Sequence, residues 1–121
     1  MAKILLVEDH RITQRILTHT LTKHQHTCVL ANNGVEALEK VAAQDFDLAL
    51  VDIAMPLMDG ITFLRELRSG AFQSNLPVIM LSASGQEGDK VVAQELGVKM
   101  FLSKPVSTWE LSSNVERVLN G

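Results

Sequence analysis

Nearly unbroken apolar runs recur along the chain, separated by longer stretches in which apolar residues return every three to four positions. Such runs predict strands that are covered on both faces, because a strand with one face in water would alternate apolar and polar side chains. Strands are therefore predicted at residues 3–7, 27–31, 46–51, 77–81 and 99–102.

The stretches between these runs have the apolar spacing of amphipathic helices. Helices are predicted at residues 11–23, 35–43, 61–68 and 89–96, and a last helix follows Ser107, which forms a capping box with Glu110. In the first helix, Asp9 or His10 is the expected start. Its predicted apolar face consists of Ile12, Ile16, Leu17 and Leu21, with Thr13, Gln14, Arg15 and Lys23 on the polar side.

Strands that alternate with helices predict an α/β fold, a doubly wound parallel sheet with helices on both faces. Right-handed crossovers then bring the carboxyl end of every strand to one edge of the sheet, where ligands bind. Polar residues follow four of the predicted strands at that edge, namely Glu8, Asp9, Asp52, Ser82 and Lys104. The pattern predicts that these side chains meet in one site.

Composition narrows the class of protein. A chain of 121 residues with 46% hydrophobic and 21% charged residues fits one globular domain, expected to cover residues 1–121 without an output domain. A net charge of -3 gives no basic field for nucleic acid. The apolar runs are too short to span a membrane, and no signal-type apolar region is seen, so a cytoplasmic protein is expected. The single cysteine, Cys28, is expected to pack as a small apolar residue.

The predicted edge has the chemistry of a phosphoryl-transfer site. Three carboxylates, from Glu8, Asp9 and Asp52, form an oxygen-rich pocket that suits Mg²⁺ better than zinc. No glycine-rich nucleotide-binding loop is found, whereas a carboxylate such as Asp52 can itself attack phosphorus and form an acyl phosphate. Without metal, the three acids should repel one another, raise at least one pKa and make the protein more stable at mildly acidic pH.

Five motifs in order resemble the receiver domains of two-component response regulators, the CheY-like family. They are residues 4–9, Asn33-Gly34-x-Glu36-Ala37-Leu38, Asp52-x-x-Met55-Pro56-x-Met58-Asp59-Gly60, Ser82-Ala83 and Lys104-Pro105. The resemblance extends over essentially the whole chain. It implies a flavodoxin-like fold of five parallel strands in the order 2-1-3-4-5 with five helices.

The resemblance also implies roles for the acidic residues. Asp52 would accept a phosphoryl group from a phosphohistidine on a sensor histidine kinase or a histidine phosphotransfer protein. Asp9 would bind Mg²⁺ directly, Glu8 mostly through water, and Asp52 and the backbone carbonyl of Ala54 would complete the metal ligands. The chain would therefore be a signalling domain that catalyses only its own phosphorylation and slow dephosphorylation.

Four residues near the later strands receive roles from the same resemblance. Lys104 and Ser82 would each contact a phosphoryl oxygen, and the bond between Lys104 and Pro105 would be cis. On phosphorylation Ser82 would move inward and Phe101 would rotate, which changes the face formed by the fourth helix, fifth strand and fifth helix. A downstream protein would read that face, and the receiver would be a monomer or a phosphorylation-linked dimer.

Two small residues, Ala54 and Ser84, occupy the positions that control phosphoryl lifetime in this family. Neither offers an acid or amide to orient water, so slow to moderate self-dephosphorylation is predicted.

Alternatives remain at this level. The chain is interpreted first as a stand-alone receiver, and second as a receiver cut from a hybrid histidine kinase or another multidomain regulator. A flavodoxin-like flavin-binding protein shares the architecture but would need a phosphate-binding loop where Glu8 and Asp9 stand. A degenerate receiver would lack an intact acceptor site. Three histidines, His19, His24 and His26, are predicted to be solvated, while the placement of Trp109 is left open.

Overall fold

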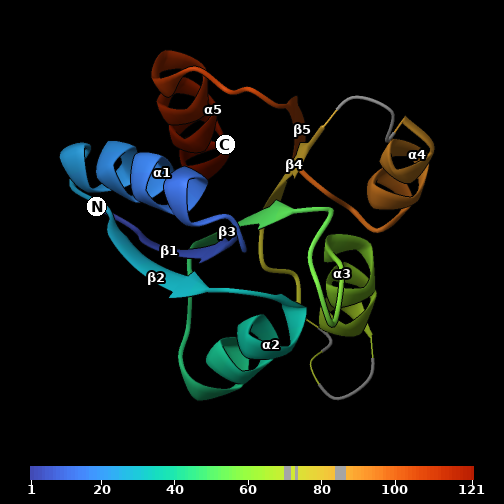
Figure 1. Cartoon of the computed structure of the whole chain (residues 1–121). Helices are drawn as coiled ribbons and strands as arrows, with labels where there is room; N and C mark the ends of the chain where they lie inside the picture. The colour runs from blue at the N-terminus through green and yellow to red at the C-terminus, as the bar shows by residue number, and fades with distance from the viewer. Residues whose placement is uncertain (70–71, 73, 84–86) are drawn as a thin grey trace.

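The computed structural model describes residues 1–69, 72, 74–83 and 87–121. Strands and helices alternate along the whole chain, as predicted (Figure 1). The strands are β1 (Lys3–Val7), β2 (Thr27–Ala31), β3 (Leu48–Asp52), β4 (Val78–Ser82) and β5 (Met100–Ser103). The helices are α1 (Arg11–Lys23), α2 (Gly34–Ala43), α3 (Gly60–Arg68), α4 (Glu87–Glu95) and α5 (Thr108–Asn120).

All neighbouring strands of the sheet run parallel, in the order β2-β1-β3-β4-β5, which confirms the predicted topology. The order reverses at β1, which pairs with β2 on one side and β3 on the other. The carboxyl ends of β1 and β3 therefore lie side by side at the point where such folds bind ligands.

The sheet separates two apolar layers, because neighbouring residues of a strand point to opposite faces. Ile4 and Leu6 of β1 pack with side chains of α1 and α5, whereas Leu5 and Val7 pack with those of α2, α3 and α4. Figure 1 shows the same division of the helices about the sheet. All four of these β1 side chains are fully buried, which explains why the strand appears in the sequence as an unbroken apolar run.

The apolar face predicted for α1 is partly wrong. Ile12 and Ile16 are 64% and 52% exposed, while Gln14 is buried beside Leu17 on the face that meets the sheet. Gln14 lies three residues before Leu17 and thus on the same side of the helix. Its amide finds hydrogen-bond partners inside, so the helix buries it and turns the two isoleucines outward.

Strand β3 and helix α4 begin two residues away from their predicted starts, and the other helix and strand boundaries agree with the prediction within one residue. Strand β3 begins at Leu48 rather than residue 46 and continues to Asp52, which stays in register with Leu81 of β4. Helix α4 begins at Glu87, two residues before the predicted start. Ser84, one of the two predicted lifetime positions, lies outside the described residues. Within the described parts of the chain, no helix is long and apolar enough to cross a membrane.

The prediction that His26 is solvated is wrong, whereas His19 and His24 are exposed as expected. His26 directly precedes β2, and its imidazole is covered by the start of β1 and the end of α5. Trp109 is 76% exposed in the first turn of α5, which decides the placement that the sequence left open.

Candidate functional site

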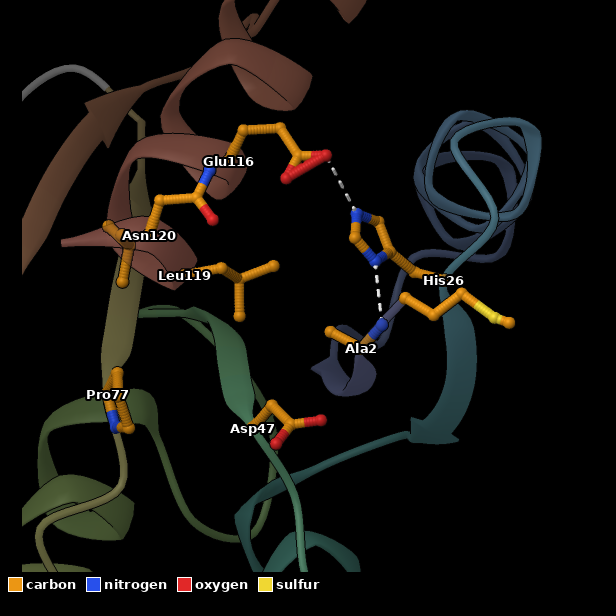
Figure 2. A pocket seen from close by; sticks show the side chains of 9 residues that line it. Ala2, His26, Asp47, Pro77, Glu116, Leu119 and Asn120 are labelled. Carbon is orange, nitrogen blue, oxygen red and sulfur yellow. Dashed lines mark hydrogen bonds and ion pairs between the residues drawn. The ribbon is translucent and has the colours of Figure 1, made fainter.

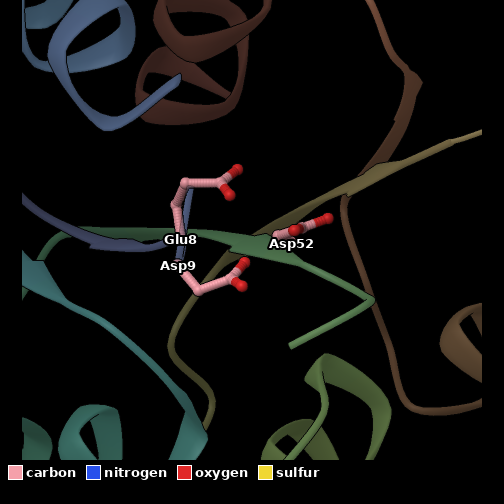
Figure 3. Close-up of side chains that lie close together, drawn as sticks. All are labelled: Glu8, Asp9 and Asp52. Carbon is pink, nitrogen blue, oxygen red and sulfur yellow. The ribbon is translucent and has the colours of Figure 1, made fainter. Parts of the chain in front are cut away.

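The acidic site lies at the carboxyl ends of β1 and β3. Glu8 and Asp9 follow β1, and Asp52 is the last residue of β3 (Figure 3). One carboxylate oxygen from each residue lies within 4.8 Å of the others. Glu8 is fully buried and Asp52 is 5% exposed, while Asp9 is exposed. The structure thus brings together the three acids that the sequence pattern placed at one edge.

Lys104, which follows β5 at the same edge of the sheet, compensates part of this negative charge. Its Nζ donates a hydrogen bond to Oε1 of Glu8 at 3.0 Å and lies 3.1 Å from Oδ1 of Asp52. Its backbone N–H donates to the carbonyl of Ser82 at 2.7 Å, and the peptide bond to Pro105 is cis. Lys104 therefore stands between the two buried carboxylates.

Gln14 is a part of the site that the sequence analysis missed. Its side-chain amide donates hydrogen bonds to the backbone carbonyl of Glu8 and to Oδ1 of Asn32, the latter at 2.7 Å. The backbone N–H of His10 donates to Oε2 of Glu8 at 3.0 Å. These contacts fix the chain around the acids. The spacing of Gln14 with Leu17 and Leu21 was the available signal, because it places all three on one helical face.

The loop after Asp52 forms the outer wall of the site. Ala54 is exposed beside a hollow of about 460 Å³ that Asp9, Asp59 and Asp89 also line. Asp59 caps helix α3, with its Oδ1 accepting a hydrogen bond from the Thr62 N–H at 2.8 Å. The acidic residues around this hollow extend the negative field of the site toward solvent.

The two residues expected to switch stand on adjacent strands. Ser82 ends β4 with 4% exposure, and Phe101 of β5 is half-buried against the apolar layer that includes α4. The ammonium of Lys90 from α4 lies 6.0 Å from the centroid of the Phe101 ring. Phe101 therefore has one side in the core and one side near a surface helix.

Burial dominates the electrostatics of Asp52. Desolvation, with the charge of Glu8 as the next cause, raises the pKa of Asp52 to about 6, and Lys104 opposes this shift. Burial lowers the pKa of Lys104, but the hydrogen bond to Glu8 and the charges of Asp52 and Glu8 outweigh burial and raise it. Asp52 is thus mostly ionised at neutral pH, and Lys104 stays protonated.

The raised pKa makes stability depend on pH. Folded Asp52 holds its proton up to about pH 6, whereas in the unfolded chain the pKa returns to its ordinary value near 4. The folded state binds more protons between these values, so metal-free protein should lose up to about 3 kcal/mol of stability as pH rises from 4 to 7. Urea unfolding in EDTA should show a smaller loss in Asp52→Asn. Equal pH dependence in both proteins would contradict this assignment.

The donor set fits a hard divalent cation. Three carboxylates lie within 4.8 Å of one another, and no histidine or cysteine belongs to this described cluster. Oxygen ligands of this kind suit Mg²⁺ and do not suit softer metals. The buried carboxylates of Glu8 and Asp52 also gain from a second positive charge beside Lys104.

Comparison with known proteins points to one family. A model of the response regulator receiver domain matches residues 4–116. The chain is 38% identical over 119 residues to the transcriptional regulatory protein CpxR homolog of Haemophilus influenzae, covering 98% of this chain and 51% of that protein. It is 36% identical over 121 residues to protein PilH of Pseudomonas aeruginosa, covering 100% of both. The chain thus spans about half the length of the first relative.

A solved structure agrees with these matches. The receiver domain of the sensor histidine kinase PA1611 from Pseudomonas aeruginosa was solved with a magnesium ion coordinated in its active site cleft. It superposes on the chain with a TM-score of 0.89 at 28% identity, and the match covers 99% of this chain and 98% of that one.

Proposed function

This chain belongs to the family of response regulator receiver domains of two-component systems, and we propose that Asp52 is its phosphoacceptor. One observation carries the proposal: Asp52 is a buried carboxylate with a protonated lysine 3.1 Å from its Oδ1 and two further acids beside it. The receiver assignment sets aside the flavin-binding alternative.

The proposed reaction follows from the chemistry of Asp52. An ionised carboxylate oxygen of Asp52 attacks phosphorus on a phosphohistidine, and the bond between phosphorus and the imidazole nitrogen breaks. The imidazole leaves with the electron pair of that bond and takes up a proton, while an acyl phosphate forms on Asp52. Lys104 and the hydroxyl of Ser82 contact phosphoryl oxygens and stabilise their negative charge.

Mg²⁺ is the proposed cofactor. When bound, it neutralises charge on the phosphoryl oxygens and on the acids. Asp9, Asp52 and the carbonyl of Ala54 would hold it, with Glu8 acting mostly through water. Support comes from the carboxylate cluster and from the magnesium ion in the related PA1611 receiver.

Phosphorylation from a small donor tests this proposal. Incubation with acetyl phosphate and Mg²⁺ should add one phosphoryl mass to the intact protein, and EDTA should reduce the yield at least about tenfold because three carboxylates repel the incoming anion. Intact mass spectrometry measures both yields. Absence of added mass, under conditions that phosphorylate a known receiver, would contradict the proposal.

A surface beside the site supports a protein phosphodonor. The exposed side chains of Ile12 and Ile16 lie on α1, and a cavity of about 320 Å³ between Ile16, Lys104 and Val106 separates α1 from the segment after β5. Exposed apolar groups rimmed by polar ones are typical of protein contacts. We propose that the sensor histidine kinase or phosphotransfer protein binds here and presents its phosphohistidine to Asp52.

The face proposed to contact a downstream protein is formed by α4, β5 and α5. Val91 and Trp109 expose 59% and 76% of their surface on the two helices, and Phe101 lies in the strand between them. Movement of Ser82 and rotation of Phe101 on phosphorylation would change this face for a downstream protein or a second receiver. We also propose that the chain acts as a stand-alone receiver in the cytoplasm. The alternative is that it is the receiver domain of a larger regulator.

The lifetime of the phosphoryl group gives a further prediction. Ala54, two residues after Asp52, is exposed and has no group that orients water. Ala54→Asn should speed hydrolysis roughly tenfold, because an amide there can position the attacking water. Decay is measured by intact mass after donor removal. Leu57→Asn is the control, since Leu57 is 85% exposed in the same loop at a φ of 67° that asparagine tolerates. A half-life of seconds that Ala54→Asn leaves unchanged would contradict this prediction.

A further inference from the structure

A second cavity opens at the opposite end of the sheet from the acidic site. It has a volume of about 320 Å³ and lies between residues that precede the strands and the last turns of α5 (Figure 2). Ala2, His26, Asp47 and Pro77 line one side, and Glu116 and Leu119 line the other. This volume is near the lower end for small-ligand sites, so it suits a single side chain or a small organic molecule.

His26 offers a buried hydrogen-bond donor to this cavity. Its side chain is 3% exposed, and its Nδ1 accepts a hydrogen bond from the Ala2 N–H at 3.1 Å. Because Nδ1 uses its lone pair in this bond, the neutral imidazole carries its proton on Nε2. Nε2 makes no hydrogen bond among the described residues, and it has a long polar contact with Oε1 of Glu116 at 3.6 Å (Figure 2). A ligand oxygen that accepts a hydrogen bond from Nε2 would remove the free-energy cost of burying an unpaired N–H group.

Charge in the cavity favours a cation. Glu116 is half-exposed, and the carboxylate of Asp47 accepts a hydrogen bond only from the neutral Lys3 N–H in the described structure. The Lys3 ammonium lies instead over the Phe46 ring, 5.4 Å from its centroid. The carboxyl end of α5 adds partial negative charge. None of the described residues that line the cavity is a lysine or an arginine, and Met1 is 96% exposed to water.

The tautomer of His26 decides which kind of cation fits. A transition metal would need the Nε2 lone pair, but Nε2 carries the proton while Nδ1 accepts from Ala2. An organic cation places no such demand on His26. The apolar side chains of Leu119 and Pro77 can cover its methylene groups, as they do for lysine and arginine stems elsewhere.

We propose that this cavity binds an organic cation that carries a neutral oxygen acceptor, the chemistry of an arginine or lysine amide. The ligand oxygen accepts from Nε2 of His26, and the cationic head lies beside Glu116 and Asp47. Such a ligand is either a free small amine or a basic residue in a segment of another protein. The site is separate from the phosphoacceptor site, so the two proposals stand or fall independently.

Titration of tag-free protein with N-acetylargininamide tests the proposal. NMR of the imidazole nitrogens should show a saturable shift of His26 Nε2. The neutral analogue N-acetylcitrullinamide and the variant Glu116→Gln should each weaken binding about fivefold, because one charge interaction is lost. Glu39→Gln, at an exposed position on α2, is the matched control and should bind like the unsubstituted protein. Glu116 is itself partly exposed, so its variant should fold.

A peptide arm distinguishes the two sources. Tighter binding of blocked Gly-Arg-Gly than of N-acetylargininamide supports a protein segment, and equal binding supports a small molecule. The proposal is overturned if no saturable shift appears up to about 10 mM ligand. It is also overturned if the shift spares His26, as it would where the cavity holds only water, or if Glu116→Gln or the citrulline analogue binds with unchanged affinity.

Discussion

Asp52→Asn should abolish phosphoryl transfer to this receiver, with a yield at least about 100-fold below that of the unsubstituted protein. An amide oxygen lacks the negative charge that makes the Asp52 carboxylate a nucleophile. The fold should survive, because Lys104 keeps its 3.0 Å hydrogen bond to Glu8 and the amide leaves no buried charge uncompensated. Intact mass after incubation with acetyl phosphate and Mg²⁺ measures the yield.

The control for this prediction is another aspartate-to-asparagine change. Asp45 is exposed in the turn between α2 and β3, away from the acidic cluster, so Asp45→Asn should be phosphorylated normally. Added mass of equal yield in Asp52→Asn would assign the acceptor to another group. Asp52→Asn is also the variant used for the urea unfolding measurement in EDTA. At neutral pH it should be more stable than the unsubstituted protein, because the substitution removes a carboxylate whose pKa is raised by folding.

Gly60→Ala should destabilise the protein by about 2–4 kcal/mol and reduce phosphorylation as well. A Cβ at Gly60 would lie 2.5 Å from the backbone oxygen of Asp52 and 2.9 Å from the Cα of Ile53. Both are backbone atoms at the end of β3, and the Gly60 N–H donates to the Ile53 carbonyl at 2.8 Å. Relief of the clash must therefore move the loop or the acceptor residue. Urea unfolding and the acetyl phosphate assay measure the two effects.

Gly88 provides the matched comparison. A Cβ at this position in α4 meets no atom within 4 Å, so Gly88→Ala should leave stability unchanged or raise it by up to about 1 kcal/mol through helix propensity. Similar losses in both variants would show that the close approach at Gly60 has no special cost.

The part of the site formed by residues at the ends of strands could be predicted from the sequence. Asp52 and Glu8 end apolar runs, and any right-handed arrangement of alternating strands and helices brings such ends to one edge. The same rule places Lys104 at this edge, but the particular contacts of Lys104 and Gln14 with Glu8 could not be predicted. The hydrogen bond of Lys104 to Glu8 joins residues 96 positions apart, and Gln14 reaches Glu8 only because α1 packs with its amide inward.

The sequence prediction and the tertiary structure differ most clearly at His26. Its neighbours in the sequence are polar, which indicated a solvated turn, yet the start of β1 and the end of α5 cover its imidazole. Ile12 and Ile16 differ in the opposite sense, since apolar spacing predicted burial and the structure exposes both. The apolar periodicity of a helix predicts its buried face only approximately. The elements that pack against the helix decide which side chains are buried.

By itself the sequence determined the alternation of strands and helices, the parallel sheet and the gathering of Glu8, Asp9 and Asp52 at its edge. These features depend on periodicity and chain connectivity, which are local properties. The tertiary structure alone decided the place of Lys104 between two carboxylates, the close approach at Gly60 and the cavity beside His26. Each of these depends on distances between segments far apart in the chain, and packing of the whole fold sets such distances.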